Sequence, residues 1–276
     1  MTSPFSMRLG MALSDRGPLC VGIDPSPALL HAWGLEDDAS GAEHFARLAI
    51  DALWEHVGVV KFQVAFYERH GSAGYQALER MIAHARGAGL LVIGDAKRGD
   101  IVSTNEGYAE AWLTDGSPLS VDAMTVSCYL GAAALKDLFA VAHRNGRGVF
   151  AVVSSSNDEG RRLQTATTED GRSVEEALLS ELGSFNKMMD GGGQPSRCVG
   201  AVIGAQRRPA GLSGFDGPVL VPGTGAQGGD EADVAELRAL LPHDRVTVNV
   251  SRSILSLGPS PSALQQAAVA LNAALA

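Results

Sequence analysis

Short apolar runs recur along the 276-residue chain, and each of them ends in polar residues. Nearly continuous apolar strands are expected where helices cover both faces of a sheet. Eight runs predict such strands, at 19–23, 57–60, 90–93, 121–126, 148–153, 198–203, 218–221 and 246–250. Helical patterns lie between most of them, at 42–56, 74–88, 132–144, 174–186 and 231–241. About eight β–α units predict an α/β chain that closes into a (β/α)8 or TIM barrel.

Two regions depart from the simplest barrel. We expect residues 1–18, ahead of the first strand, to form a short helix or a cap. Residues 157–197 form a long insertion between two strands, with a helical pattern and a loop of three glycines inside it. No linker divides the chain and no internal repeat appears, so residues 1–276 are predicted to form a single domain.

Composition narrows the class of protein. The net charge of −9 argues against broad nucleic-acid binding, although an acidic protein can still hold a local basic pocket. Cys20, Cys128 and Cys198 are far apart and odd in number, which favours reduced thiols in a cytoplasmic protein. The seven histidines show no metal-ligand spacing. The N-terminus does not resemble a signal peptide, and no apolar run is long enough to cross a membrane.

The densest charged cluster follows the run 90–93, where residues 94–101 read GDAKRGDI. Because side chains alternate along a strand, Asp95 and Lys97 point to the same face, and Asp100 follows three residues later. Lys61 ends a neighbouring apolar run, so we expect it to pair with Asp95. Buried charges need partners, and the cluster therefore indicates either a structural salt-bridge network or a dry catalytic site with a lysine as general acid.

A second motif, PGTGAQGGD, begins at Pro222 and precedes the helical pattern 231–241. Glycines such as Gly223, Gly225 and Gly228 let backbone N–H groups approach an anion closely. Arg252 ends the following strand, and the loops after the last two strands of a barrel commonly bind phosphate. A flexible turn is the simpler interpretation. The three glycines also match a dinucleotide fingerprint, but only one strand follows them.

Polar residues end other predicted strands as well. Asp24 closes the first strand, where it could hold a sugar hydroxyl or cap the helix that follows it. Thr125, Ser127, Ser156 and Asn157 could hydrogen-bond a polar ring, although each alone is typical of a turn.

Together these motifs resemble the orotidine 5′-phosphate decarboxylase family over essentially the whole chain. The resemblance rests on Asp-x-Lys-x-x-Asp-Ile-x-x-Thr at 95–104, the loop 222–229 and Ser-Arg-Ser-Ile at 251–254. The length, the insertion and residues 126–131 are similar to the longer bacterial branch, type 2, common in actinobacteria. The resemblance implies a TIM barrel, usually a homodimer, that converts orotidine 5′-monophosphate (OMP) to UMP and CO₂ in pyrimidine synthesis without a metal or cofactor.

The resemblance also implies roles for the charged residues. Lys97 would donate the proton to C6 of the pyrimidine, and Asp95 would lie beside the substrate carboxylate. Lys61 would pair with Asp95 and with a ribose hydroxyl, while Asp24 would hold the ribose. Because the bond that breaks leaves charge on C6, a fixed cation at that carbon is the expected stabiliser.

Other roles are implied for residues farther from the breaking bond. Asp100 and Thr104 would reach into the site of the partner subunit. Gln227 and Arg252 would hold the phosphate. Ser156 would contact the pyrimidine, but Asp158 stands where the family often has proline, so the serine within 154–156 that meets the ring stays open.

Two other functions remain possible from the sequence. A Mg²⁺-dependent sugar-phosphate decarboxylase or aldolase of the same barrel superfamily would share the Asp-x-Lys-x-x-Asp core, but no further carboxylate is clearly placed as a metal ligand. A non-catalytic sensor of phosphate ligands would not need all four charged residues of the cluster.

Overall fold

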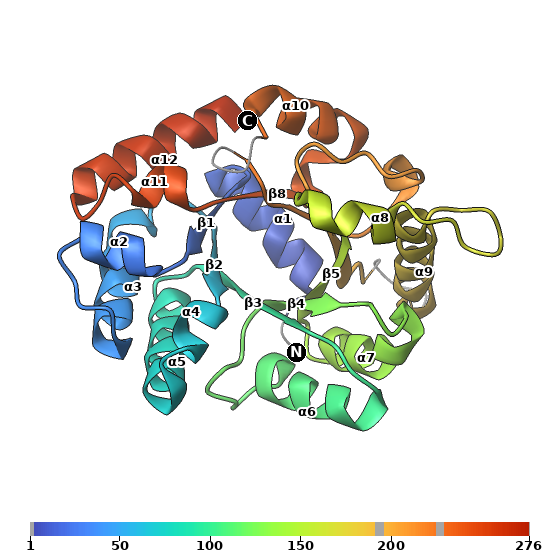
Figure 1. Cartoon of the computed structure of the whole chain (residues 1–276), viewed down its shortest axis with the longest axis horizontal. Helices are drawn as coiled ribbons and strands as arrows, with labels where there is room; N and C mark the ends of the chain where they lie inside the picture. Colours follow the sequence, from blue (N-terminus) through green and yellow to red (C-terminus); the bar gives the residue numbers. More distant parts are fainter. Residues whose placement is uncertain (1–2, 191–195, 225–228, 276) are drawn as a thin grey trace.

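The computed structural model describes residues 3–190, 196–224 and 229–275. Eight parallel strands pair in chain order, and β8 pairs with β1, so the sheet closes into a barrel with helices outside it (Figure 1). The predicted TIM barrel is confirmed. The strands are β1 Leu19–Ile23, β2 Val59–Gln63, β3 Leu91–Arg98, β4 Ala123–Ser127, β5 Gly148–Ser154, β6 Val199–Ile203, β7 Val219–Val221 and β8 Val246–Val250.

The helices between the strands include every predicted one and several that no pattern indicated. The α-helices are α1 Phe5–Arg16, α2 Pro27–Ala32, α3 Ala39–Leu53, α4 Ala65–Glu68, α5 Gly71–Gly87, α6 Val102–Leu113, α7 Lys136–Arg144, α8 Arg161–Gln164, α9 Val174–Met189, α10 Glu231–Leu240, α11 Arg252–Leu255 and α12 Pro261–Leu275. Short 3₁₀ turns lie at Ala132–Leu135, Asp158–Gly160, Leu212–Gly214 and His243–Arg245.

One end of the barrel is filled with apolar side chains. Phe5, Leu9 and Leu13 of α1 belong to the same buried cluster as inward-facing strand residues such as Val59 and Phe150. Figure 1 shows α1 lying across the barrel behind the strands. Because α1 precedes β1, it lies at the end where the strands begin. The polar site therefore lies at the opposite end, where the strands finish.

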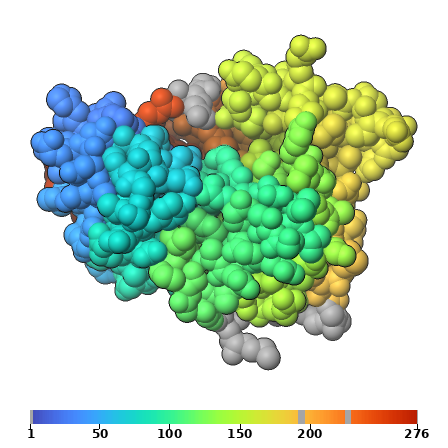
Figure 2. All heavy atoms as spheres, turned by 60° about the horizontal axis from the view of Figure 1, so that its bottom comes forward, coloured from blue at the N-terminus to red at the C-terminus, as the bar shows by residue number. Residues whose placement is uncertain are grey.

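The insertion at 157–197 contains two different parts. Helix α9 packs on β5, β6 and α7, as the helix between two barrel strands does. Residues 157–173, which include α8, exceed the plain barrel pattern and stand above its body in Figure 2, coloured yellow. The chain therefore adds a short segment at the rim where the strands end.

Within the described residues, no helix is long and apolar enough to cross a membrane.

Candidate functional site

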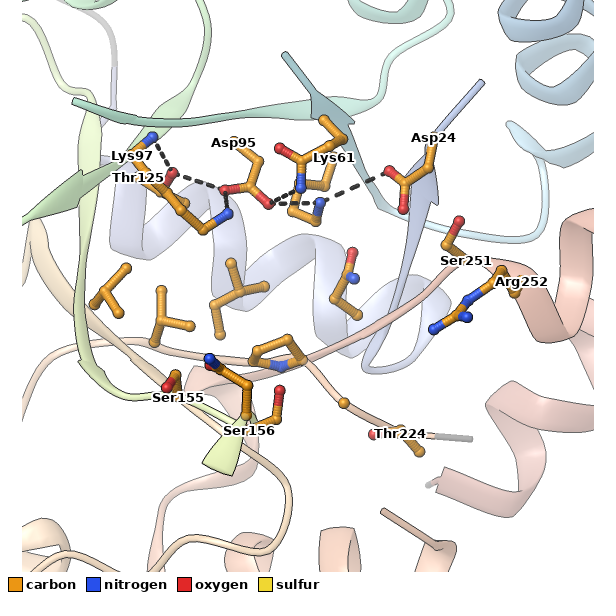
Figure 3. A pocket seen from close by; sticks show the side chains of 18 of the residues that line it. Asp24, Lys61, Asp95, Lys97, Thr125, Ser155, Ser156, Thr224, Ser251 and Arg252 are labelled. Atoms are coloured by element: carbon orange, nitrogen blue, oxygen red, sulfur yellow. Dashed lines mark hydrogen bonds and ion pairs between the residues drawn. The ribbon is translucent and has the colours of Figure 1, made fainter. Parts of the chain in front are cut away.

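A cavity of about 310 Å³ opens where the strands end. Residues at the ends of all eight strands line it (Figure 3). Polar groups converge there above the apolar interior, which is typical of a ligand site. The sequence-predicted site residues that line it are Asp24, Lys61, Asp95, Lys97, Thr125, Ser156, Asn157, Pro222, Gly223 and Arg252.

Asp95 lies at the centre of a charged array on one wall of the cavity (Figure 3). Lys61 Nζ donates to its Oδ2 at 2.8 Å, and Lys97 Nζ donates to its Oδ1 at 2.5 Å. Thr125 Oγ1 also donates to Oδ1, at 2.9 Å, and Gln63 Nε2 donates to Oδ2 at 3.2 Å. Both carboxylate oxygens thus accept from one ammonium group and one neutral donor, as a buried charge requires.

Burial differs sharply within this array. Lys61 and Asp95 are only 4% and 7% exposed, whereas the side chain of Lys97 is 50% exposed at the cavity wall. Burial alone would raise the pKa of Asp95, but Lys61 and Lys97 hold it well below its ordinary value. Burial alone would lower the pKa of Lys61, but Asp95 and Asp24 raise it. The buried pair therefore stays charged, and Lys97 is the more exposed of the two lysines in the array.

The backbone at Lys97 is held in an unusual conformation. Its φ is +46°, in the left-handed region that side chains other than glycine seldom adopt. The register between β3 and β4 shifts between Gly94 and Arg98, and Lys97 N donates to Thr125 Oγ1 at 2.9 Å. Such strain persists only where the surroundings impose it, and it is common at functional sites. Here the bulge turns Lys97 toward the cavity, next to Asp95.

Asp24 extends the array toward β1. Its Oδ1 lies 3.9 Å from Lys61 Nζ, and this oxygen is buried without a hydrogen bond among the described residues. The alternative role as a helix cap is wrong, because Ser26 caps α2 by accepting from Leu29 N. Asp24 is thus a carboxylate at the cavity wall with an acceptor available for a ligand hydroxyl.

The opposite end of the cavity carries donors suited to an anion. Arg252 begins α11 with an exposed side chain, and Ser251 precedes it (Figure 3). Thr224 Oγ1 and Ser251 Oγ are buried, and neither has a hydrogen-bond partner among the described residues. Gly223 has a φ of +92°, and its carbonyl accepts from Gly229 N at 3.0 Å. The predicted loop residues Gly225, Gln227 and Gly228 lie outside the described residues.

Sequence reasoning missed several lining residues. Gln63 and Asn249 lie in strands and line the cavity. Thr224 and Ser251, which lie beyond the ends of β7 and β8, line it as well. Asn249 had a usable signal, since a lone amide within the apolar run 246–250 is unusual in a strand covered on both faces. Gln63 also had a usable signal, because it shares the strand face of Lys61.

Three predicted residues within the described part of the chain do not line the cavity. Ser127 ends β4 with an exposed side chain, while Asp100 and Thr104 lie beyond the end of β3. Gly99 permits this path, because a Cβ there would meet the carbonyl oxygen of Ser127 at 2.2 Å. Asp100 is held firmly by Asn105, which is fully buried. Asn105 Oδ1 accepts from Asp100 N at 3.0 Å, and its Nδ2 donates to Asp100 O at 2.5 Å.

The described residues contain no group of three or more His, Cys, Asp or Glu side chains arranged to hold a metal ion. At the centre of the site, Asp95 instead faces two ammonium groups.

Comparison with known proteins agrees with this geometry. Residues 17–267 match the model of the orotidine 5′-phosphate decarboxylase / HUMPS family. The chain is 46% identical over 268 residues to an orotidine 5′-phosphate decarboxylase of Corynebacterium efficiens, covering 97% of this chain and 95% of that protein. It is also 46% identical over 274 residues to the protein of the same name from Streptomyces coelicolor, covering 96% and 94%.

Solved structures extend the likeness to three dimensions. A crystal structure from Streptomyces avermitilis superposes with a TM-score of 0.89 at 46% identity, covering 99% of this chain and 95% of that one. The OMP decarboxylase of Leishmania donovani superposes with a TM-score of 0.74 at 25% identity, covering 99% and 98%. On these matches, the chain belongs to the orotidine 5′-phosphate decarboxylase / HUMPS family.

Proposed function

We propose that this protein decarboxylates OMP to UMP and CO₂, with Lys97 as the proton donor to C6. The observation that carries the proposal is the Lys61–Asp95–Lys97 array, which presents a half-exposed ammonium group beside a buried carboxylate at the cavity wall. The family of the chain and the names of its relatives support the same reaction.

The array suits the chemistry of this reaction. When the bond between C6 and the carboxylate breaks, CO₂ leaves and the electron pair stays on C6, in an orbital that cannot conjugate with the ring. The Lys97 ammonium supplies both a fixed positive charge and the proton that completes UMP. Asp95, kept ionised by Lys61, keeps Lys97 paired and pointed along the wall until the proton moves. Solvent then restores the proton, since Lys97 is half exposed.

The remaining lining residues bind the parts of the substrate that do not react. Asp24 and Lys61 hold ribose hydroxyls, and Arg252 holds the phosphate together with the loop that starts at Pro222. Ser156 lies on the wall opposite the array (Figure 3), from which it contacts the pyrimidine ring. Binding energy from the remote phosphate orders the site around the ring.

The Mg²⁺-dependent alternative fits the array less well. A divalent cation at Asp95 would meet two ammonium groups, each within 3 Å of the carboxylate oxygens it needs. The charges therefore favour a reaction in which the lysines themselves face the substrate.

The first prediction is that purified protein converts OMP to UMP, and that EDTA does not change the rate. The reason is that Lys97 supplies the charge and the proton for which other enzymes use a metal ion. The measurement is the loss of OMP absorbance, with UMP identified by chromatography, at equal enzyme with and without EDTA.

Folded protein that leaves OMP unchanged would refute the proposed reaction. Activity that EDTA removes and Mg²⁺ restores would instead assign the protein to metal-dependent chemistry.

We also propose that the protein is a homodimer in which Asp100 and Thr104 complete the site of the partner. An apolar surface surrounds them: Ile101 is 62% exposed and Tyr129 is 80% exposed, and Val102 and Leu130 are exposed as well. α6 packs beside the segment that follows β4, so these side chains belong to one region of the surface. Apolar side chains of this size gathered at one place are typical of a protein interface.

The second prediction concerns mixed dimers. Asp100→Ala and Lys97→Ala proteins should each have little activity, and mixing them should restore up to about a quarter of the wild-type activity per subunit. Random exchange makes half of the dimers mixed, and each mixed dimer has one site with both native residues. The measurement is OMP turnover after subunit exchange, with exchange verified by mass spectrometry of differently tagged subunits.

A mixture of two differently tagged Lys97→Ala proteins is the matched control and should stay inactive. Proven exchange without recovered activity would mean that Asp100 acts within its own subunit.

A further inference from the structure

Ser155 is held by side chains from two separate segments. Gln164 of α8 accepts from Ser155 N at 3.1 Å, and Gln164 Nε2 donates to Ser155 Oγ at 2.9 Å. Arg207, beyond the end of β6, donates from Nε to Ser155 O at 3.0 Å. The backbone N–H, the carbonyl and the hydroxyl of this one residue are therefore all bound by side chains distant from it in sequence.

Two glycines are needed for this arrangement. A Cβ at Gly160 would lie 2.9 Å from both Gln164 Nε2 and Ser155 Oγ, so a larger residue would separate the two side chains. A Cβ at Gly204 would lie 2.8 Å from the Cα and N of Ser156, which are backbone atoms that cannot move aside cheaply. Gly204 N also donates to Ser154 O at 2.7 Å. The backbone of 154–156 is thus pressed between α8 and the end of β6.

The same contacts separate the roles of the two serines that line the cavity. The hydroxyl of Ser155 already exchanges hydrogen bonds with the amide of Gln164. Ser156 is the next residue, and its backbone lies directly against Gly204. Figure 3 shows both serines on the wall opposite Lys97, Asp95 and Lys61. A shift of the Ser155 backbone would therefore move Ser156 relative to the charged array.

We propose that Gln164 and Arg207 are positioning residues that clamp Ser155 and thereby fix Ser156, the residue that meets the pyrimidine ring. This inference rests on the proposed function of the site. It assigns a task to the rim segment 157–173, whose α8 carries Gln164. Asp158, in the same segment, pairs with Arg207 at 3.3 Å and so links the two arms of the clamp. Because Asp158 is almost fully exposed, this pair contributes less than the contacts to Ser155.

The test separates ring binding from phosphate binding. Gln164→Ala should lower kcat/KM for OMP by about 10- to 100-fold, since small misplacements in a site cost rates of that size. It should weaken UMP binding about tenfold, the effect of a lost or misdirected hydrogen bond. Binding of ribose 5-phosphate, which has no ring, should change less than about twofold. Gln164→Glu retains the acceptor for Ser155 N but loses the Nε2 donor, and should fall between Gln164→Ala and the wild type.

Arg207→Lys is the second variant, and it keeps the charge but loses the Nε–H that donates to Ser155 O. It should show the same selective loss of UMP binding. Leu163→Ala, at an exposed neighbour in α8, and Gln76→Ala, at an exposed residue of α5, are matched controls that should behave as wild type.

Each outcome decides one question. Equal losses for UMP and ribose 5-phosphate would show general damage and overturn the positioning role, as would wild-type UMP binding in both Gln164→Ala and Arg207→Lys. If Gln164→Ala does not fold, Gln164→Glu and Arg207→Lys decide the matter by the same comparison. Failure of the wild-type protein to convert OMP would overturn the proposed function itself. This result comes from the wild-type assay, so it is distinct from the comparison among variants.

Discussion

Replacing Lys97 by alanine is expected to lower kcat for OMP by at least about 10⁴-fold. Under the proposed mechanism the variant loses both the proton donor and the cation nearest the reacting carbon, and no other described side chain is placed to replace them. Lys61 is almost fully buried and bound to Asp95, so it cannot move to the substrate without leaving that carboxylate unpaired. The measurement is single-turnover conversion of OMP, with UMP affinity determined on the same preparation by calorimetry.

UMP should still bind to this variant, because the proposed ribose, phosphate and ring contacts come from other residues. Lys187→Ala, at an exposed lysine near the end of α9, is the matched control and should keep full activity. Turnover within tenfold of the wild type would remove Lys97 from the mechanism. Loss of both turnover and UMP binding would mean that Lys97 serves the structure of the site rather than the chemical step.

The fold was largely readable from the order of apolar runs, but the ends of the strands were not. The apolar runs themselves stop at residues 60 and 93, and only the expected alternation of Lys61 with Gln63 and of Asp95 with Lys97 carried the strands further. In the structure β2 reaches Gln63 and β3 reaches Arg98. When strands are predicted from hydropathy, a charged residue is taken as the end of a strand, because burying an unpaired charge is costly. These charges face one another inside the barrel, so the strands continue through them.

Helices with weak amphipathic patterns were also missed. α6 mixes polar and apolar residues around its whole surface and exposes Val102 near its start, so no periodicity distinguished it. If the partner subunit covers the exposed side of α6, the apolar residues there are placed by contacts between subunits. Such contacts leave no helical periodicity directed at the core of a single chain. α12 is rich in alanine, which leaves little contrast between its faces.

The residues of the site were likewise predictable only in part from the sequence. Residues within one motif, such as Asp95 and Lys97, could be assigned together because strand alternation fixes their common face. Gln164 and Arg207 could not, because their importance arises from contacts with Ser155 across 9 and 52 residues of sequence. Asn105 was invisible for a related reason: it holds the backbone of Asp100, and a buried asparagine within α6 has no sequence signature.

Asp95→Asn is expected to lower the free energy of unfolding by about 3–5 kcal/mol at pH 7, the usual cost of breaking a buried ion pair. The amide keeps the shape of the carboxylate but leaves Lys61 in the interior with only Asp24, at 3.9 Å, as a charged partner. Asp95→Asn/Lys61→Met should recover part of the loss, since it removes the stranded charge. Urea denaturation followed by circular dichroism measures all three proteins.

The pH dependence of this loss has a definite sign. In the wild type, the lowered pKa of Asp95 gives stability that is present above its ordinary value of 3.8 and lost only as pH falls through the lower folded value. The raised pKa of Lys61 gives stability that is complete below its ordinary value of 10.5 and lost only as pH rises through the higher folded value. The contribution of the pair is therefore constant from about pH 5 to pH 9.

In Asp95→Asn only Asp24 still opposes the effect of burial on Lys61, so we expect the pKa of Lys61 to fall below that of the unfolded chain. The unfolded state then binds more protons than the folded state, so the free energy of unfolding must rise with pH up to about 10. The deficit relative to wild type should narrow between pH 6 and pH 10. Asp170→Asn, which breaks an exposed pair with Arg172, should show no such slope. A deficit that stays constant with pH would mean that Lys61 remains charged in the variant, held by Asp24 alone, and the buried pair would then contribute less to the fold than its geometry indicates.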